Sequence, residues 1–258
     1  IMQSYKVHFA TLSVLIAAGS SVFAGPLVTD RPDATESSSV IAPGVAQFEV
    51  GVTAVEGTDG ESAVEYGGSL LRLGLVEDWE LRLGWGGYLE SDAVAGANDA
   101  MLGFKYYISP EGDSWLEPEA AILVHTSLPV GDRDLTSDQL DPDFLLSFSH
   151  TLSEQFSLGY NLGGMLETSE KADGSETTLS SALYSVALGY GATEQLGLFL
   201  EVFGAAGLSA DESPASLDGG ITWLFNDDSQ LDVFAGVGLN DDADDWFVGL
   251  GYSIRWAR

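Results

Sequence analysis

Residues 230–256 read QLDVFAGVGLNDDADDWFVGLGYSIRW, and this stretch decides the fold. Apolar side chains recur at alternate positions from Leu231 onward and, after an acidic turn, as far as Trp256. Phe234 and Phe247 are exceptions, because they fall among the small and polar residues of the other phase. Alternation predicts two strands with one apolar face each. Strands of soluble sandwiches have about 5–6 residues, whereas about 9–11 residues are needed for a tilted bilayer crossing. The hairpin therefore favours a membrane β-barrel.

Composition excludes several functional classes. The chain has 258 residues, enough for one barrel or one large all-β domain. Its 40 acidic against 9 basic side chains argue against binding to nucleic-acid phosphates, which requires clustered Lys and Arg. Without cysteine there is no disulfide framework and no cysteine-based metal or redox site. After the first thirty residues, no apolar run approaches the roughly 18 residues of a membrane helix.

The N-terminus has the features of a targeting segment. Lys6 supplies a weakly basic start, Phe9 to Ala18 forms an apolar core, and residues 22–24 approximate a small-x-small cleavage pattern. We expect a signal peptide over residues 1–24, although an ordinary core helix remains the alternative. An exported chain with amphipathic strands fits the outer membrane of a double-membrane bacterium.

Residues 44–258 predict one domain, an all-β transmembrane up-and-down antiparallel β-barrel of about twelve strands. Short turns alternate with longer, mostly acidic loops, and an even strand number puts both termini on the periplasmic side. Residues 25–43 lack periodicity and are predicted to be a periplasmic or lumen-entering segment. In the strand expected to end at Glu90, alternation predicts that Leu89 faces outward, and that Tyr88 and Glu90 face inward.

Charged residues within the predicted strands share the polar phase. They are Glu49, Arg72, Glu80, Arg82, Lys105, Glu119, Glu201, Asp232 and Arg255. A charge facing lipid at mid-depth costs about 2–4 kcal/mol, so we expect these side chains in the lumen. There they must pair or stay hydrated. Two interpretations remain open: a structural network that fills a narrow barrel, or residues that line a solute path and set its selectivity.

An enzymatic interpretation starts from His125 and Ser127, which share one face of a predicted strand. Asp143 and Asn161 are the candidate groups to orient the imidazole. However, His125 lies on the luminal phase, whereas a hydrolase of membrane lipid must present its site to lipid. No Gly-x-Ser-x-Gly motif or metal-ligand cluster is present, and the acidic loops lack the spacing of an EF-hand. We expect no catalysis, no cofactor and no bound metal.

Several short motifs resemble a known family. Residues 28–37 read VTDRPDATES, residues 43–49 read PGVAQFE, and the chain closes with FVGLGY at 247–252. Further matches are Leu71-Arg72-x-Gly74-Leu75, Glu80-Leu81-Arg82, Leu128-Pro129-x-Gly131-Asp132, Gly159-Tyr160-Asn161-x-Gly163, Gln230-Leu231-Asp232 and Gly236-x-Gly238-Leu239. In order and spacing these resemble the transporter-type outer-membrane barrels of the family of the MetA-pathway of phenol degradation, in which a Thr-Asp-Arg-Pro-Asp segment opens the mature protein.

The resemblance implies a channel-like barrel, loosely tied to export or uptake of aromatic or other hydrophobic compounds, and supplies no catalytic residues. The family's conspicuous charged positions correspond to Asp30, Arg31, Glu36, Glu49, Arg72, Arg82 and Asp232. We hypothesise that the N-terminal segment forms a plug or gate inside the barrel, with Asp30, Arg31, Asp33 and Glu36 as its charged members. Asp30 would pair with Arg82 or Arg72, and Arg31 with Glu49.

The leading interpretation is a passive outer-membrane channel or transporter for small solutes, aromatic or hydrophobic ones included, with a charged lumen. A closed structural or adhesive barrel is the alternative, and a soluble secreted β-sandwich is a third reading. Outward-facing Trp side chains argue against the sandwich, because so many apolar faces need lipid or a second sheet. Expected partners are outer-membrane lipid, the solute, and barrel-assembly machinery that reads Tyr252-x-Ile254-x-Trp256; nucleic acid is not expected.

Overall fold

The computed structural model describes residues 25–58, 60–170 and 175–257, so the expected signal peptide lies outside the described residues. Within them, the strands form one 14-stranded antiparallel sheet. The strands are β1 (Val45–Glu56), β2 (Ser62–Val76), β3 (Trp79–Trp85), β4 (Tyr88–Ser91), β5 (Ala95–Ala97), β6 (Ala100–Ser109), β7 (Glu119–Leu128), β8 (Pro142–Thr151), β9 (Phe156–Glu170), β10 (Glu176–Gly191), β11 (Leu196–Gly207), β12 (Ala215–Asn226), β13 (Ser229–Gly238) and β14 (Trp246–Ala257).

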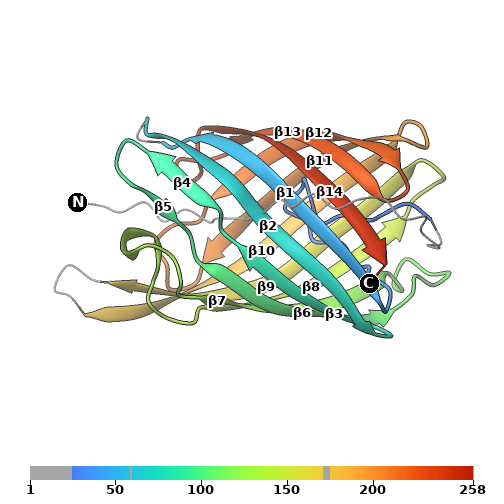
Figure 1. Cartoon of the computed structure of the whole chain (residues 1–258), viewed down its shortest axis with the longest axis horizontal. Helices are drawn as coiled ribbons and strands as arrows, with labels where there is room; N and C mark the ends of the chain where they lie inside the picture. The colour runs from blue at the N-terminus through green and yellow to red at the C-terminus, as the bar shows by residue number, and fades with distance from the viewer. Residues whose placement is uncertain (1–24, 59, 171–174, 258) are drawn as a thin grey trace.

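The sheet closes on itself. Strand β1 pairs with β2 along one edge and with β14 along the other, from Val45 opposite Ala257 to Glu56 opposite Trp246. Every other strand pairs with a sequence neighbour, once the short β4 and β5 are set aside. Figure 1 shows the strands wrapping obliquely around a barrel, with the end of β14 and the start of β1 at the same end. The predicted up-and-down antiparallel barrel is confirmed.

Two of the barrel strands are interrupted near the end that carries β4 and β5. Strand β4 continues β3 beyond Gly86-Gly87, and β5 leads into β6 across Asn98-Asp99. Hydrogen bonds from Gly86 N to Asp99 O (2.8 Å) and from Asn98 N to Gly87 O (2.9 Å) bridge the two breaks. Counting each interrupted pair as one crossing strand gives the closed 12-strand barrel expected from the sequence.

The first interruption overturns the predicted facing of three residues. Gly87 has a positive φ of 70°, a conformation that glycine adopts without steric cost. The alternation is out of phase beyond it: Leu89 is buried opposite Glu65, while Tyr88 is 43% exposed and Glu90 is also exposed. Leu89 therefore faces inward, and Tyr88 and Glu90 face outward, the reverse of the prediction.

The two faces of the wall differ as alternation requires. Apolar side chains project outward, for example Leu162 at 54% and Leu200 at 56% exposure, and Trp79 and Trp223 lie near the strand ends. The other phase buries charge completely, with Arg72 and Lys105 at 0% exposure. An apolar outer surface around a polar interior suits a barrel surrounded by lipid. In the described part of the chain, no helix has the length and apolar character to span a membrane.

Candidate functional site in the barrel lumen

Residues 25–43, here called the N-terminal segment, run inside the barrel. The segment starts at the rim near the C-terminus, where Arg255 Nη2 donates to Gly25 O (2.8 Å) and Leu27 N donates to Asp227 O (2.7 Å). It returns to the same rim before β1, where Gly44 N donates to Gly74 O (3.2 Å). Between these ends it contacts side chains from β1, β2, β3, β6, β7, β8, β9, β10, β11 and β13.

Wall carboxylates hold the backbone of this segment. Glu49 accepts from the N–H groups of Asp30 (3.1 Å) and Arg31 (3.0 Å). Glu201 accepts from Ala34 N (2.6 Å), and Glu80 accepts from Ile41 N (2.9 Å). Backbone N–H groups away from water must find acceptors. A segment without secondary structure is stable in the lumen because acidic side chains on the inward phase supply them.

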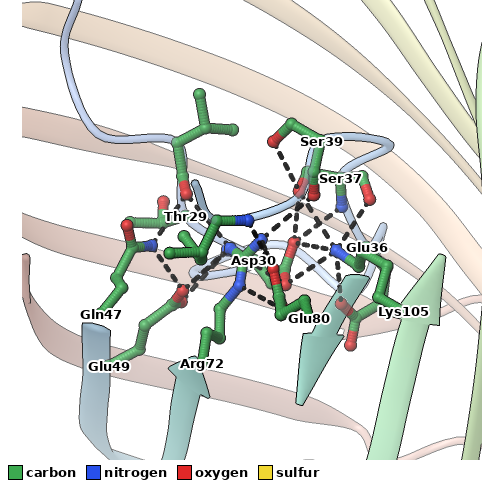
Figure 2. A network of polar contacts seen from close by, with 12 residues as sticks. Thr29, Asp30, Glu36, Ser37, Ser39, Gln47, Glu49, Arg72, Glu80 and Lys105 are labelled. Atoms are coloured by element: carbon green, nitrogen blue, oxygen red, sulfur yellow. Dashed lines mark hydrogen bonds and ion pairs between the residues drawn. The ribbon is translucent and has the colours of Figure 1, made fainter. Parts of the chain in front are cut away.

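An ionic cluster anchors the segment to one side of the lumen. Its members are Asp30, Glu36, Glu49, Arg72, Glu80, Arg82 and Lys105. Asp30 lies at the centre of the cluster (Figure 2). Asp30 Oδ2 lies 2.6 Å from Arg82 Nη1, 3.1 Å from Arg72 Nη1 and 3.1 Å from Lys105 Nζ. Burial alone would raise the pKa of Asp30, but the three cations outweigh it and hold that pKa well below its usual value.

The wall carboxylates complete the charge balance of the ionic cluster. Glu80 pairs with Arg72 (2.8 Å) and with Arg82 (3.0 Å), and Glu49 lies 3.2 Å from Arg72. Glu36 binds Arg82 Nη2 through both carboxylate oxygens, at 2.8 and 2.7 Å. The five wall members have 0% exposure, so each buried charge has an opposite partner within reach, as burial demands.

Arg31 departs from the predicted pairing. Its side chain pairs with Asp232 (3.0 Å) on β13. The predicted partner, Glu49, instead accepts from the backbone N–H of Arg31 (3.0 Å). The guanidinium also lies over the Phe234 ring, 5.6 Å from its centroid. Gly51 and Gly251 face it, and a Cβ at either position would collide with the guanidinium. Their missing side chains make the space that Arg31 fills.

The remaining predicted residues lie apart from the ionic cluster. Glu119 accepts from Ser38 (2.6 Å) and Ser149 (3.0 Å). Arg255 pairs with Asp228 (2.8 Å) at the rim. On the β11 side, Thr35 Oγ1 donates to Glu201. Asp33 lies within electrostatic reach of Glu201, as well as of Asp30.

The possible catalytic pair does not form. His125 Nδ1 lies 2.9 Å from Asp143 Oδ1 on β8, one of the two orienting groups expected. However, the Ser127 hydroxyl bonds to the loop before β8, accepting from Asp141 N (3.1 Å), and His125 Nε2 finds no hydrogen-bond partner among the described residues. Within the described residues, no group of three or more His, Asp or Glu side chains is arranged to hold a metal ion.

The sequence did not identify several luminal contacts of the N-terminal segment, and Asn161, expected as an orienting group for His125, binds Glu36 instead. Ser147 and Asn161 both donate to Glu36 O, at 2.6 and 3.0 Å, and Gln47 donates to Val28 O (2.8 Å). Their position on the polar phase was the available signal. The two off-phase aromatics, Phe234 and Phe247, gave a clearer one: their rings lie inside the lumen over glycines of neighbouring strands.

The described geometry can be compared with known proteins. An outer membrane channel from Pseudomonas putida F1 has a TM-score of 0.64 at 12% identity, covering 84% of this chain and 97% of that chain. The NanC porin has a TM-score of 0.57 at 7% identity, and the KdgM porin has a TM-score of 0.52 at 8% identity. Each comparison covers 81% of this chain and 98% of the porin. No curated protein matches the chain.

These likenesses establish the fold, and with the apolar outer wall they place the protein in the bacterial outer membrane. A profile of the family described as "Putative MetA-pathway of phenol degradation" matches residues 29–256. The match runs from the lumen-docked N-terminal segment to the closing strand β14. The chain therefore belongs to this family.

Proposed function

We propose that the protein is a passive channel for small solutes, aromatic or hydrophobic ones included, and that the N-terminal segment forms its constriction. Flux would follow the solute gradient and be screened by the width and charge of the lumen. The names of the structural neighbours, an outer membrane channel and two porins, support transport over an adhesive role. In this proposal the luminal residues that fix the segment are Glu49, Arg72, Glu80, Arg82, Lys105, Glu201 and Asp232.

The observation that carries the proposal is the unequal filling of the lumen. On the side formed by β1, β2, β3 and β6, the wall members of the ionic cluster have 0% exposure. On the side formed by β11–β14 the carboxylates of Glu201, Asp218 and Asp232 are also buried, but the luminal Phe203 and Phe247 stay partly exposed, as does Asp33 of the segment. A solute would therefore pass along the β11–β14 wall, where an apolar surface lies beside carboxylates.

A closed barrel is the second candidate, because complete burial of the ionic cluster also suits a structural interior. Liposome swelling separates the two. We expect proteoliposomes to admit small sugars and phenol faster than protein-free liposomes. No flux of any solute, with either the wild type or a variant lacking residues 25–39, would refute the channel and leave the closed barrel.

Single-channel conductance tests the constriction itself. Deleting residues 25–39 removes all but the last four residues of the segment and leaves every strand intact, so conductance should rise. Equal conductance of the deletion variant and the wild type would remove the plug from the proposal. The matched control is Asp143→Asn, which removes a luminal carboxylate bound to His125 on the wall and not to the segment.

The same proposal includes two partners outside the lumen. Outer-membrane lipid would contact the apolar outer wall, and barrel-assembly machinery would read the alternating apolar residues of β14, ending at Trp256. Replacing Trp256 with Ser should slow insertion into the outer membrane, measured as the folded fraction on unheated gels. An unchanged folded fraction would contradict recognition of this residue.

A further inference from the structure

The luminal wall of β11–β14 combines aromatic rings with carboxylates. Phe203, Phe234 and Phe247 all face inward; the Phe247 centroid lies 6.0 Å from that of Phe203 and 6.2 Å from that of Phe234. The rings of Phe234 and Phe247 lie over Gly249 and Gly236, where a Cβ would collide with them. Glycine in one strand thus lets the ring of the next lie flat against the wall, giving a continuous apolar surface.

Asp218 brings a carboxylate to the edge of this surface. The register places Asp218 of β12 opposite Gly236 of β13, which is opposite Phe247 of β14. Because Gly236 has no side chain, Asp218 and Phe247 become neighbours across it, and a Cβ built there would lie 2.6 Å from the Asp218 Cβ. On its other side Asp218 is paired with Glu201 in the register.

The Asp218 carboxyl group is hydrogen-bonded to Glu201, but in the described residues it has no cationic partner. Its residue is 4% exposed, and its Oδ1 accepts no hydrogen bond from the described residues. Within the described part of the chain no ion pair reaches Asp218, Glu201 or Asp33, whereas Asp30, Glu49 and Glu80 are all paired with cations. Two neighbouring buried carboxyl groups that share only a hydrogen bond with each other, with no cation beside them, are costly, so this site favours a ligand that supplies positive charge.

The protein already holds one cation in this way. Arg31 binds the Asp232 carboxylate at 3.0 Å and covers the Phe234 ring at 5.6 Å. Asp218 and Phe247 repeat the pairing of carboxylate and ring on the same wall, without a side chain of the protein in the role of Arg31. A cation over an aromatic face gains from the ring quadrupole, and more so when desolvated.

We propose that Asp218, Glu201, Phe247 and Phe203 form a luminal binding site for organic ammonium ions with an apolar body, such as arylalkylamines. The inference rests on the proposed channel function and names its solute class. The ammonium group binds Asp218 Oδ1 with Glu201 close by, and the apolar body lies on the rings. A neutral aromatic solute uses the rings alone, and an anionic one is repelled by the carboxylates.

Binding can be measured separately from transport, by isothermal titration of the full-length, detergent-solubilised barrel. The probes are 2-phenylethylammonium, its neutral counterpart 2-phenylethanol and the anionic phenylacetate. We expect the ammonium ion to bind about tenfold more tightly than the alcohol, the typical effect of a charge-assisted hydrogen bond. Phenylacetate should bind most weakly. Equal affinities for the ammonium ion and the alcohol would overturn the proposal.

Matched variants assign the site. Asp218→Asn should weaken binding of the ammonium ion about tenfold, while Asp218→Glu should keep the preference for it. Phe247→Leu should weaken binding about fivefold. Asp113→Asn in an exposed turn and Phe144→Leu on the outer wall should leave affinity unchanged. Migration of unheated samples on gels verifies that each variant folds, and full affinity in Asp218→Asn would refute the assignment.

Failure of this inference is distinguishable from failure of the channel proposal. If 2-phenylethylammonium binds with the expected preference but proteoliposomes pass no solute, the site stands and the channel proposal falls. If sugars and phenol cross the membrane but the ammonium ion binds no better than the alcohol, the channel stands and the site falls.

Discussion

Replacing Asp30 with Asn should release the N-terminal segment from the wall. Asp30 is the one residue of the segment that contacts Arg72, Arg82 and Lys105 together, all within 3.1 Å. Asn keeps the size of the side chain but loses the charge, and its amide group faces three cations. Removing one partner from a buried ion pair costs about 3–5 kcal/mol. Because Glu36, Glu49 and Glu80 still compensate the cations, we take the lower end, about 3 kcal/mol.

The absence of cysteine from the chain makes this change measurable. Ser38→Cys places a thiol at a position of the segment that is 3% exposed. A water-soluble methanethiosulfonate reagent then reports the fraction of time that the segment is undocked. Since about 1.4 kcal/mol corresponds to a tenfold change in an equilibrium constant, Asp30→Asn should accelerate labelling about a hundredfold.

Two comparisons make the result decisive. Asp143→Asn removes a luminal carboxylate that binds His125 and no residue of the segment, so labelling of Ser38→Cys should keep its parent rate. Unheated gel migration verifies that the barrel is closed in every variant. If Asp30→Asn labels at the parent rate in a folded barrel, the ionic cluster does not hold the segment and the reasoning fails.

Three further predictions concern other parts of the barrel. Gly251→Val puts a side chain where the Arg31 guanidinium lies and should accelerate labelling of Ser38→Cys, while Gly191→Val at the exposed end of β10, where a Cβ meets no atom closer than 3.9 Å, should not. Leu200→Arg on the outer wall should lower the free energy of unfolding in liposomes by about 2–4 kcal/mol, measured by urea titration; a smaller loss would argue against lipid contact. Val52→Cys with Leu250→Cys, which are paired between β1 and β14, should form a disulfide that alters gel migration, whereas Val52→Cys with Tyr252→Cys should not.

Most of the fold was predictable because one physical constraint acts along every strand. Because lipid lies outside and charge inside, apolar and polar residues alternate along each strand. Residue type alone therefore assigned Arg72, Arg82 and Lys105 to the inward face. The constraint says nothing about a local break in a strand. The alternation shifts by one residue after Gly86-Gly87, and glycine has no side chain to show which face it lies on. The shift was therefore not predicted, and Leu89 was assigned to the wrong face.

The site was less predictable than the wall, because phase assigns a residue to the lumen without giving its partner. Arg31 could reach either of two luminal carboxylates, and the choice of Asp232 over Glu49 follows from the space above Gly51 and Gly251. Asp218 escaped notice for a similar reason. Its significance depends on a glycine in the next strand, which becomes visible only with the register between β12, β13 and β14.

The N-terminal segment enters and leaves the lumen at a single rim, since Gly25 lies beside Arg255 and Gly44 beside Gly74. A loop held at both ends near one opening can leave the lumen through that opening without breaking any hydrogen bonds between strands. No charge has to cross lipid. Docking and release are thus compatible with an intact, fully assembled wall.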